Sequence, residues 1–153
     1  MKSAVVPIQI RLVYPGPSGC AIFLGNDEKT FVIQIEPQMG HVIGRLLSGQ
    51  ANERPLTHDL IQHMFKGFAI TVERVIITDL RNGTYYARLI LQQENEVAKK
   101  IVEIDARPSD CLAIATAQKR PIYITRTLLD NVEDMTAELE KFGEGSEGGT
   151  EPD

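Results

Sequence analysis

The stretch that decides the fold is residues 70–92, ITVERVIITDLRNGTYYARLILQ. Its Asn82-Gly83 pair is a strong signal for a two-residue hairpin turn, because both turn positions require positive φ angles. β-branched and aromatic residues, which favour extended backbone, fill the flanks from Ile70 to Leu80 and from Thr84 to Gln92. The middle of the chain is therefore expected to form two long antiparallel strands.

Further strands are predicted on both sides of this hairpin. Ala4 to Tyr14 alternates apolar and polar residues, which is typical of a half-buried strand. Its apolar side is expected to carry Ile8, Ile10, Leu12 and Tyr14. Two short apolar runs, Cys20 to Leu24 and Thr30 to Ile35, flank a loop of turn-forming residues and are predicted to pair as a hairpin. The remaining strands are expected at about Lys100 to Ala106 and at Ile122 to Ile124.

Helices are predicted where apolar residues recur at three- and four-residue steps. Pro37 suits a first helical position, and the hydroxyls of Thr57 and Ser109 are expected to cap helix starts. The expected segments are Pro37 to a stop at Gly49, Thr57 to Gly67, Ser109 to Ala117, and Leu128 to Phe142.

Together these elements predict an α+β fold, in which a mixed or antiparallel sheet of about seven strands packs against three to four helices. A chain of 153 residues is near the size of one globular domain, which we place at residues 1–142. Residues 143–149 have no apolar side chain to bury, so residues 143–153 are expected to be a disordered, acidic, glycine-rich tail.

Composition limits the partners and the compartment. A net charge of -5 and a pI near 5.2 argue against a protein that holds nucleic acid through its overall field. They argue less against an enzyme that grips phosphate locally. Cys20 and Cys111 lie in apolar segments and are expected to be buried thiols in a reducing compartment. No segment approaches a membrane span or a signal-peptide core, so we expect a cytoplasmic protein without a membrane partner.

Two segments that nearly repeat each other carry the candidate chemistry, Arg54-Pro55-Leu56-Thr57-His58-Asp59-Leu60 and Arg107-Pro108-Ser109-Asp110-Cys111-Leu112. In each, the proline keeps the arginine extended, and the helix start presents backbone N–H groups and a positive dipole end. An arginine beside such a helix start favours phosphate. The candidate phosphate-binding residues are therefore Arg54, Thr57, Arg107 and Ser109.

Acidic residues accompany these arginines. Asp59 and Asp110 lie in first helical turns, and Asp105 ends the preceding strand. Hard cations take oxygen ligands, so Asp105 and Asp110 are candidate ligands of Mg²⁺ or Mn²⁺, which would neutralise an attacked phosphate and activate water. His58 is a candidate general base or acid. The candidate catalytic set is thus His58, Asp59, Asp105 and Asp110.

Each of these residues also has a purely structural interpretation. An acid in the first helical turn is favoured by the helix dipole alone, which applies to Asp59 and Asp110. Asp105 and Arg107 lie two apart on an extended segment and can simply pair with each other. His58 can be an ordinary surface histidine beside a helix cap. His41 lies on the polar side of its helix and receives no role.

The two Arg-Pro segments resemble the signature of the bifunctional nuclease domain family. Phe23-Leu24-Gly25, Asn82 to Ala87 and Pro121-Ile122-Tyr123 fit the same pattern, so the resemblance extends from about Val6 to Leu129. One departure is Cys111, where such proteins commonly carry a small aliphatic residue. The resemblance implies a divalent-metal-dependent nuclease that acts on RNA or single-stranded DNA.

Two hypotheses from different classes follow. The first is an enzyme that hydrolyses phosphodiester bonds and meets nucleic acid as a transient substrate. The second is a non-catalytic regulatory module, in which the helix starts hold an anion or a partner and the acids serve as caps and ion pairs. In both cases a homo-oligomer is expected, because small domains often pair an exposed strand edge.

Overall fold

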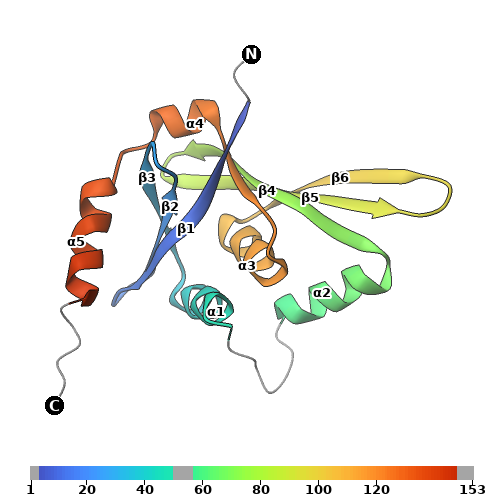
Figure 1. Cartoon of the computed structure of the whole chain (residues 1–153), viewed down its shortest axis with the longest axis horizontal. Coiled ribbons are helices and arrows are strands. Elements are labelled where there is room, and N and C mark those ends of the chain that lie inside the picture. The colour runs from blue at the N-terminus through green and yellow to red at the C-terminus, as the bar shows by residue number, and fades with distance from the viewer. Residues whose placement is uncertain (1–3, 50–56, 148–153) are drawn as a thin grey trace.

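The computed structural model describes residues 4–49 and 57–147, with side chains described up to residue 142. Within these residues the chain forms one sheet of seven strands and five helices, which confirms the predicted α+β class (Figure 1). The strands are β1 (Val5–Pro15), β2 (Cys20–Gly25), β3 (Thr30–Ile35), β4 (Ile70–Arg81), β5 (Thr84–Glu94), β6 (Lys99–Ala106) and β7 (Ile122–Thr125). The helices are α1 (Pro37–Leu47), α2 (Thr57–Gly67), α3 (Pro108–Gln118), α4 (Arg126–Asn131) and α5 (Thr136–Glu147).

The short strand β7 joins the two halves of the sheet. The strand order is β3-β2-β1-β7-β4-β5-β6, and β7 pairs antiparallel with β1 and parallel with β4. Its Ile122 lies opposite Ile8 of β1 and Val75 of β4, and Ile124 is completely buried. A strand near the C-terminus of the chain therefore closes a core that the N-terminal and central strands begin.

The hairpin of β4 and β5 forms as predicted. Asn82 and Gly83 have φ angles of 51° and 79°, the positive values that a tight two-residue turn requires. The ladder runs from Arg81 opposite Thr84 to Ile70 opposite Gln93, with register shifts on the β4 side. In Figure 1 β4 begins next to α2, and the outer part of β5 extends to the right beside β6.

A bulge in β1 changes which side chains enter the core. The register skips Arg11, since Ile10 lies opposite Leu24 whereas Leu12 lies opposite Phe23. The extra residue rotates the rest of the strand. Beyond it Val13 packs against the core, and Tyr14 contacts Phe142 of α5, with ring centroids 4.3 Å apart. The expectation that Ile8, Ile10, Leu12 and Tyr14 share one side is therefore wrong past Ile10.

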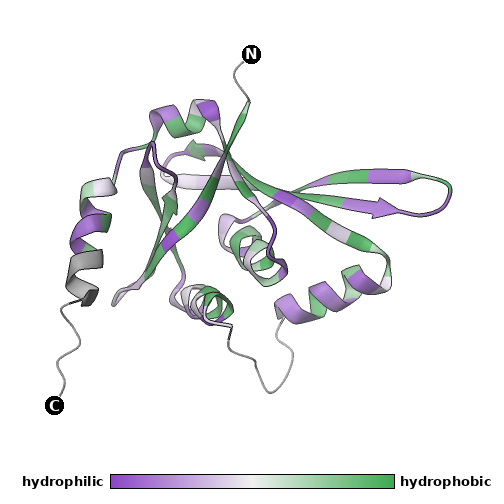
Figure 2. Cartoon of the chain, in the orientation of Figure 1, coloured by the Kyte–Doolittle hydropathy of each residue, from purple (hydrophilic) through white to green (hydrophobic). Residues whose placement is uncertain are grey.

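Helices α1 and α3 cover one face of the sheet, and α2 lies beside α3 (Figure 1). Most of α3 is hydrophobic, whereas α2 alternates hydrophilic and hydrophobic residues (Figure 2). This difference matches their burial, because residues 111–115 of α3 are all buried and α2 has no buried residue. Cys20 and Cys111 are both buried free thiols, as predicted.

Helix α3 begins two residues earlier than predicted, because Arg107 takes the N-cap position that was expected for Ser109. Its N-cap is Arg107, with extended backbone at φ -65° and ψ 143°, and Pro108 occupies the first helical position. Ser109 is buried inside the first turn, so the expectation that it caps the helix is wrong. Proline explains the shift, because it cannot donate a backbone hydrogen bond and is tolerated at the first helical position.

The predicted final helix from Leu128 to Phe142 is two helices. Thr125 caps α4 by accepting a hydrogen bond from the Leu128 amide at 3.3 Å, and Val132 ends α4 in extended backbone. Asp134 then accepts a hydrogen bond from the Thr136 amide at 3.0 Å, before α5 begins. Because α5 ends at Glu147, residues 143–147 are helical where a disordered tail was expected, and residues 148–153 lie outside the described residues.

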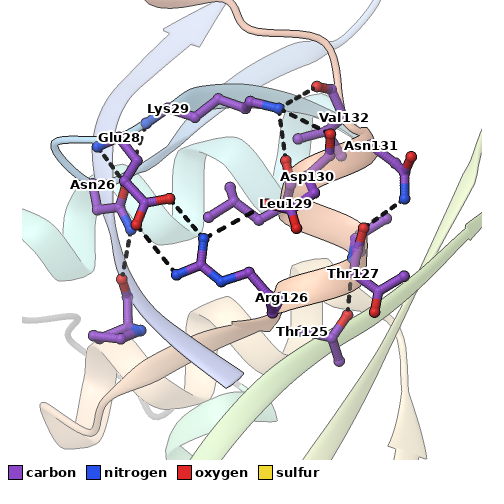
Figure 3. Close-up of polar contacts among 12 residues, drawn as sticks. Asn26, Glu28, Lys29, Thr125, Arg126, Thr127, Leu129, Asp130, Asn131 and Val132 are labelled. Carbon is purple, nitrogen blue, oxygen red and sulfur yellow. Dashed lines mark hydrogen bonds and ion pairs between the residues drawn. The ribbon is translucent and has the colours of Figure 1, made fainter. Parts of the chain in front are cut away.

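Lys29 anchors the break between α4 and α5 to the hairpin of β2 and β3 (Figure 3). Its Nζ donates hydrogen bonds to the carbonyl oxygens of Leu129 at 2.8 Å, Asp130 at 3.4 Å and Val132 at 3.0 Å. Beside it, Arg126 forms a bidentate ion pair with Glu28.

Among the described residues, no helix has both the length and the hydrophobicity needed to cross a membrane.

Candidate functional site

The starts of α2 and α3 meet, which brings together candidate residues from the two Arg-Pro segments. The Nε2 atom of His58, in the first turn of α2, lies 3.6 Å from the Oδ1 atom of Asp110, in the first turn of α3. The side chain of His58 is 11% exposed and that of Asp110 is 34% exposed. A carboxylate that solvent can reach therefore faces an imidazole that is largely shielded from solvent.

Arg107 ties this pair to the start of a third helix. Its Nε lies 3.0 Å from Asp110 Oδ2, and its Nη1 lies 3.0 Å from an oxygen of Glu36. Glu36 is the N-cap of α1, just as Arg107 is the N-cap of α3. The hydrogen bond and charge of Asp110, followed by the charge of Glu36, raise the pKa of Arg107 above its ordinary value. The starts of α1 and α3 thus meet at one guanidinium group, and His58 adds the start of α2 through Asp110.

Asp105 lies near this cluster, but it does not form the ion pair with Arg107 that the sequence suggested as its structural role. Among the described residues, the ion pairs of Arg107 are with Asp110 and Glu36 rather than with Asp105. Asp105 is exposed on β6, opposite Arg88 of β5. Burial, and then the charges of Asp110 and Asp105, raise the pKa of the Cys111 thiol to about 12. Both carboxylates are therefore close enough to act on one buried thiol.

The other candidates are placed less centrally. Thr57 is exposed at the first residue of α2, and Ser109 is buried in the first turn of α3. Asp59 lies on the wall of the cleft between α1 and α2. Arg54 lies outside the described residues. The structure therefore brings together His58, Arg107 and Asp110, with Asp59 and Asp105 at the periphery.

The cleft between α1 and α2 has a volume of about 490 Å³ and reaches His58. On the α1 side its wall includes His41, Val42 and Leu46. His41 carried no predicted role, although residues 37, 38, 41, 42 and 45 share one helical face and all line the cleft. Glu36 was also missed, and its signal was a third charged residue followed by proline at a helix start.

The carboxylates present offer oxygen ligands for a metal without enclosing one. Within residues 4–49 and 57–147, no group of three or more His, Cys, Asp or Glu side chains is placed to hold a metal ion. Asp110 and Glu36 are both hydrogen-bonded to Arg107. Magnesium commonly binds through one or two protein carboxylates together with substrate phosphates. That mode fits this donor set better than a closed protein cage.

Known proteins resemble this chain over the segment that carries the site. The family model for the bifunctional nuclease domain matches residues 22–136. The uncharacterized protein MT1877 of Mycobacterium tuberculosis is 34% identical over 104 residues, which cover 68% of this chain and 59% of that protein. Bifunctional nuclease 1 of Oryza sativa subsp. indica is 32% identical over 79 residues, 51% of this chain and 23% of that protein. The chain thus spans less than two thirds of the length of each relative.

Proposed function

Because this chain belongs to the bifunctional nuclease domain family, we propose that it hydrolyses phosphodiester bonds in RNA or single-stranded DNA where α2 and α3 meet. The observation that carries the proposal is the 3.6 Å approach of His58 Nε2 to Asp110 Oδ1. These residues come from separate Arg-Pro segments of the sequence, and their approach brings an imidazole, a carboxylate and a guanidinium together. Such a constellation suits phosphoryl chemistry better than a solitary helix cap does.

Each residue has a distinct task in this proposal. Asp110 orients the imidazole of His58, which moves a proton to or from the attacking or leaving oxygen. Arg107 is 58% exposed on its side chain, so its guanidinium has room to contact a phosphate oxygen while Asp110 or Glu36 still holds it. Because this cation is local, the proposed enzyme does not need a basic overall surface.

A divalent metal, Mg²⁺ or Mn²⁺, completes the proposal. Asp110 and Asp105 are the protein ligands that we propose, and substrate oxygens complete the coordination. A bound metal of this kind neutralises charge on the phosphate and lowers the pKa of the attacking water. Asp105 lies near the end of β6 and Asp110 in the first turn of α3, the next element of the chain, which supports their placement near one centre.

The first test removes the central carboxylate. Purified protein is incubated with a labelled single-stranded oligonucleotide in the presence of Mg²⁺, Mn²⁺ or a chelator. We expect metal-dependent cleavage that falls about 10- to 100-fold or more in Asp110→Asn. The matched control is Asp79→Asn, which breaks another exposed aspartate–arginine pair, Asp79 with Arg81 at 3.3 Å. Equal activity in wild type and Asp110→Asn would contradict the proposal.

The second test uses two histidines of the same helix. His58→Gln is expected to lower the cleavage rate about 100-fold or more, which is the usual contribution of a general acid or base. His63→Gln is the control, because His63 is exposed on α2 and has no proposed task. If both substitutions leave the rate unchanged, His58 does not transfer a proton in this protein.

The alternative is a non-catalytic binding module, and the pairing of Arg107 favours it. A guanidinium that already holds Asp110 and Glu36 can serve mainly to fasten α1 to α3. In that case purified protein would show no metal-dependent cleavage. Glu36→Gln would then lower the melting temperature more than Asp79→Asn does, because only Glu36 pairs with an arginine of a separate element.

A further inference from the structure

We propose that the cleft between α1 and α2 binds one unpaired nucleobase, adjacent to the phosphate that the proposed nuclease site holds. This inference rests on the proposed function, because it takes the substrate to be a nucleic acid. It goes further by assigning a base-binding site and by requiring that the base be free of a partner strand.

The volume and the lining of the cleft suit a nucleobase. Its volume of about 490 Å³ falls within the range of roughly 300–1,000 Å³ that is usual for small-molecule sites. Val42 and Leu46 are half-buried and supply apolar surface, and His41 contributes an exposed aromatic ring. Aromatic and apolar side chains bind the face of a nucleobase without regard to its identity. Gln38 and Arg45, also on the wall, can donate hydrogen bonds to its edge.

His58 makes the cleft continuous with the proposed phosphate site. It lines the cleft, and its Nε2 is also 3.6 Å from Asp110 Oδ1. A base in the cleft therefore lies next to the residues proposed to act on the phosphate of the same strand. In a duplex, bases are stacked and paired, so a base must be unstacked before it can enter such a pocket. The cleft thus favours single-stranded substrate over duplex.

The binding experiment compares two probes that differ only in the base. Isothermal titration calorimetry in Mg²⁺ measures the affinity of the protein for adenosine 5′-monophosphate and for ribose 5-phosphate. Stacking of one base contributes roughly 1–3 kcal/mol, so we expect the nucleotide to bind about 5- to 100-fold more tightly. Equal affinities, or no binding of either probe, would overturn the inference.

Substitutions of an exposed residue then locate the base. His41→Ala should remove most of the preference for the nucleotide, and His41→Phe should retain it, because phenylalanine keeps an aromatic face. His63→Ala is the control, since His63 is exposed on α2 and does not line the cleft. A preference that survives His41→Ala unchanged would place the base elsewhere and refute the assignment.

Failure of the inference and failure of the proposed function are separable. Cleavage next to an abasic residue is compared with cleavage at the same position of the intact strand. If the protein cleaves both equally, the proposed function stands and the base site is overturned. If the protein cleaves neither strand but prefers the nucleotide in a way that depends on His41, the base site stands and the nuclease proposal falls.

Discussion

Gly40 offers a direct test of how α1 is seated beside the candidate site. It is buried in α1 against β2, and a Cβ atom added there would lie 2.5 Å from both Cβ and Sγ of Cys20. A change of rotamer cannot relieve the contact with Cys20 Cβ, because that atom moves only with the backbone of β2. Gly44 lies one turn later in the same helix, and a Cβ added there would meet nothing within 4 Å. The two glycines are therefore a matched pair.

The expected difference follows from two opposing effects. Replacing a helical glycine by alanine stabilises the folded state by about 1 kcal/mol, because alanine loses less backbone entropy on folding. This gain applies equally to Gly40→Ala and Gly44→Ala. Overpacking costs about 1–3 kcal/mol and applies only to Gly40→Ala. For a domain of this size about 1 kcal/mol corresponds to 2–4 °C, so the two melting temperatures should differ by roughly 2–12 °C.

Thermal unfolding followed by circular dichroism measures this difference, with Gly44→Ala expected to melt above wild type and Gly40→Ala below Gly44→Ala. If Gly40→Ala melts at or above the temperature of Gly44→Ala, then α1 does not lie against Cys20 as described. The placement of Glu36 and His41 would fall with it, because α1 carries both of them.

Other perturbations test separate parts of the structure. Lys29→Met should lower the free energy of unfolding in urea by about 1–3 kcal/mol, because the carbonyls at the end of α4 lose their cationic hydrogen-bond donor. The control is Lys66→Met, since Lys66 is exposed. Equal stability of the two variants would refute the role of Lys29 in holding the end of α4. Burial raises the pKa of the Cys111 thiol to about 12 from an ordinary 9.0, so the unfolded chain loses this proton at a lower pH than the folded chain does. The free energy of unfolding should therefore fall as the pH rises from 9.0 toward about 12. Cys111→Ala should flatten that fall, and an unchanged slope would contradict it. Ile101 is 56% exposed on β6, an edge strand of the sheet, so we expect two copies of the protein to pair at this edge. Light scattering should then show that wild type self-associates and that Ile101→Lys is monomeric. A monomeric wild type would refute pairing at this edge.

Local signals in the sequence were sufficient for most elements of the fold. The Asn82-Gly83 turn was predictable because its φ angles depend on the two residues themselves. The central position of β7 was not, because four residues carry no information about which distant strands they will join. The break before α5 did have a local signal, since the side chain of Asp134 accepts a hydrogen bond from the Thr136 amide two residues later. The helical spacing of apolar residues on both sides of the break concealed this signal.

The candidate site, like the fold, has parts that local sequence signals predict and parts that they do not. His58 and Asp110 could both be named as candidates, because two similar segments each offered a helix start, an arginine and an acid, but no local signal showed that the two segments lie together in space. The role of Glu36 was not foreseeable in detail, because it lies 71 residues from Arg107 in the sequence. Only the packing of α1 against α3 brings these two N-cap residues together.

The formal charges at the three helix starts give an argument for the metal that does not depend on the family. Glu36 and Asp110 carry one negative charge each against the single positive charge of Arg107, and Asp59 and Asp105 nearby are also acidic, so the site has an excess of negative charge. A phosphodiester is also an anion, and like charges at this separation repel. One divalent cation would offset this excess and weaken the repulsion. If the α2–α3 junction is a phosphate site, phosphate should therefore bind only with the cation present, whereas a purely structural ion-pair cluster would be indifferent to both.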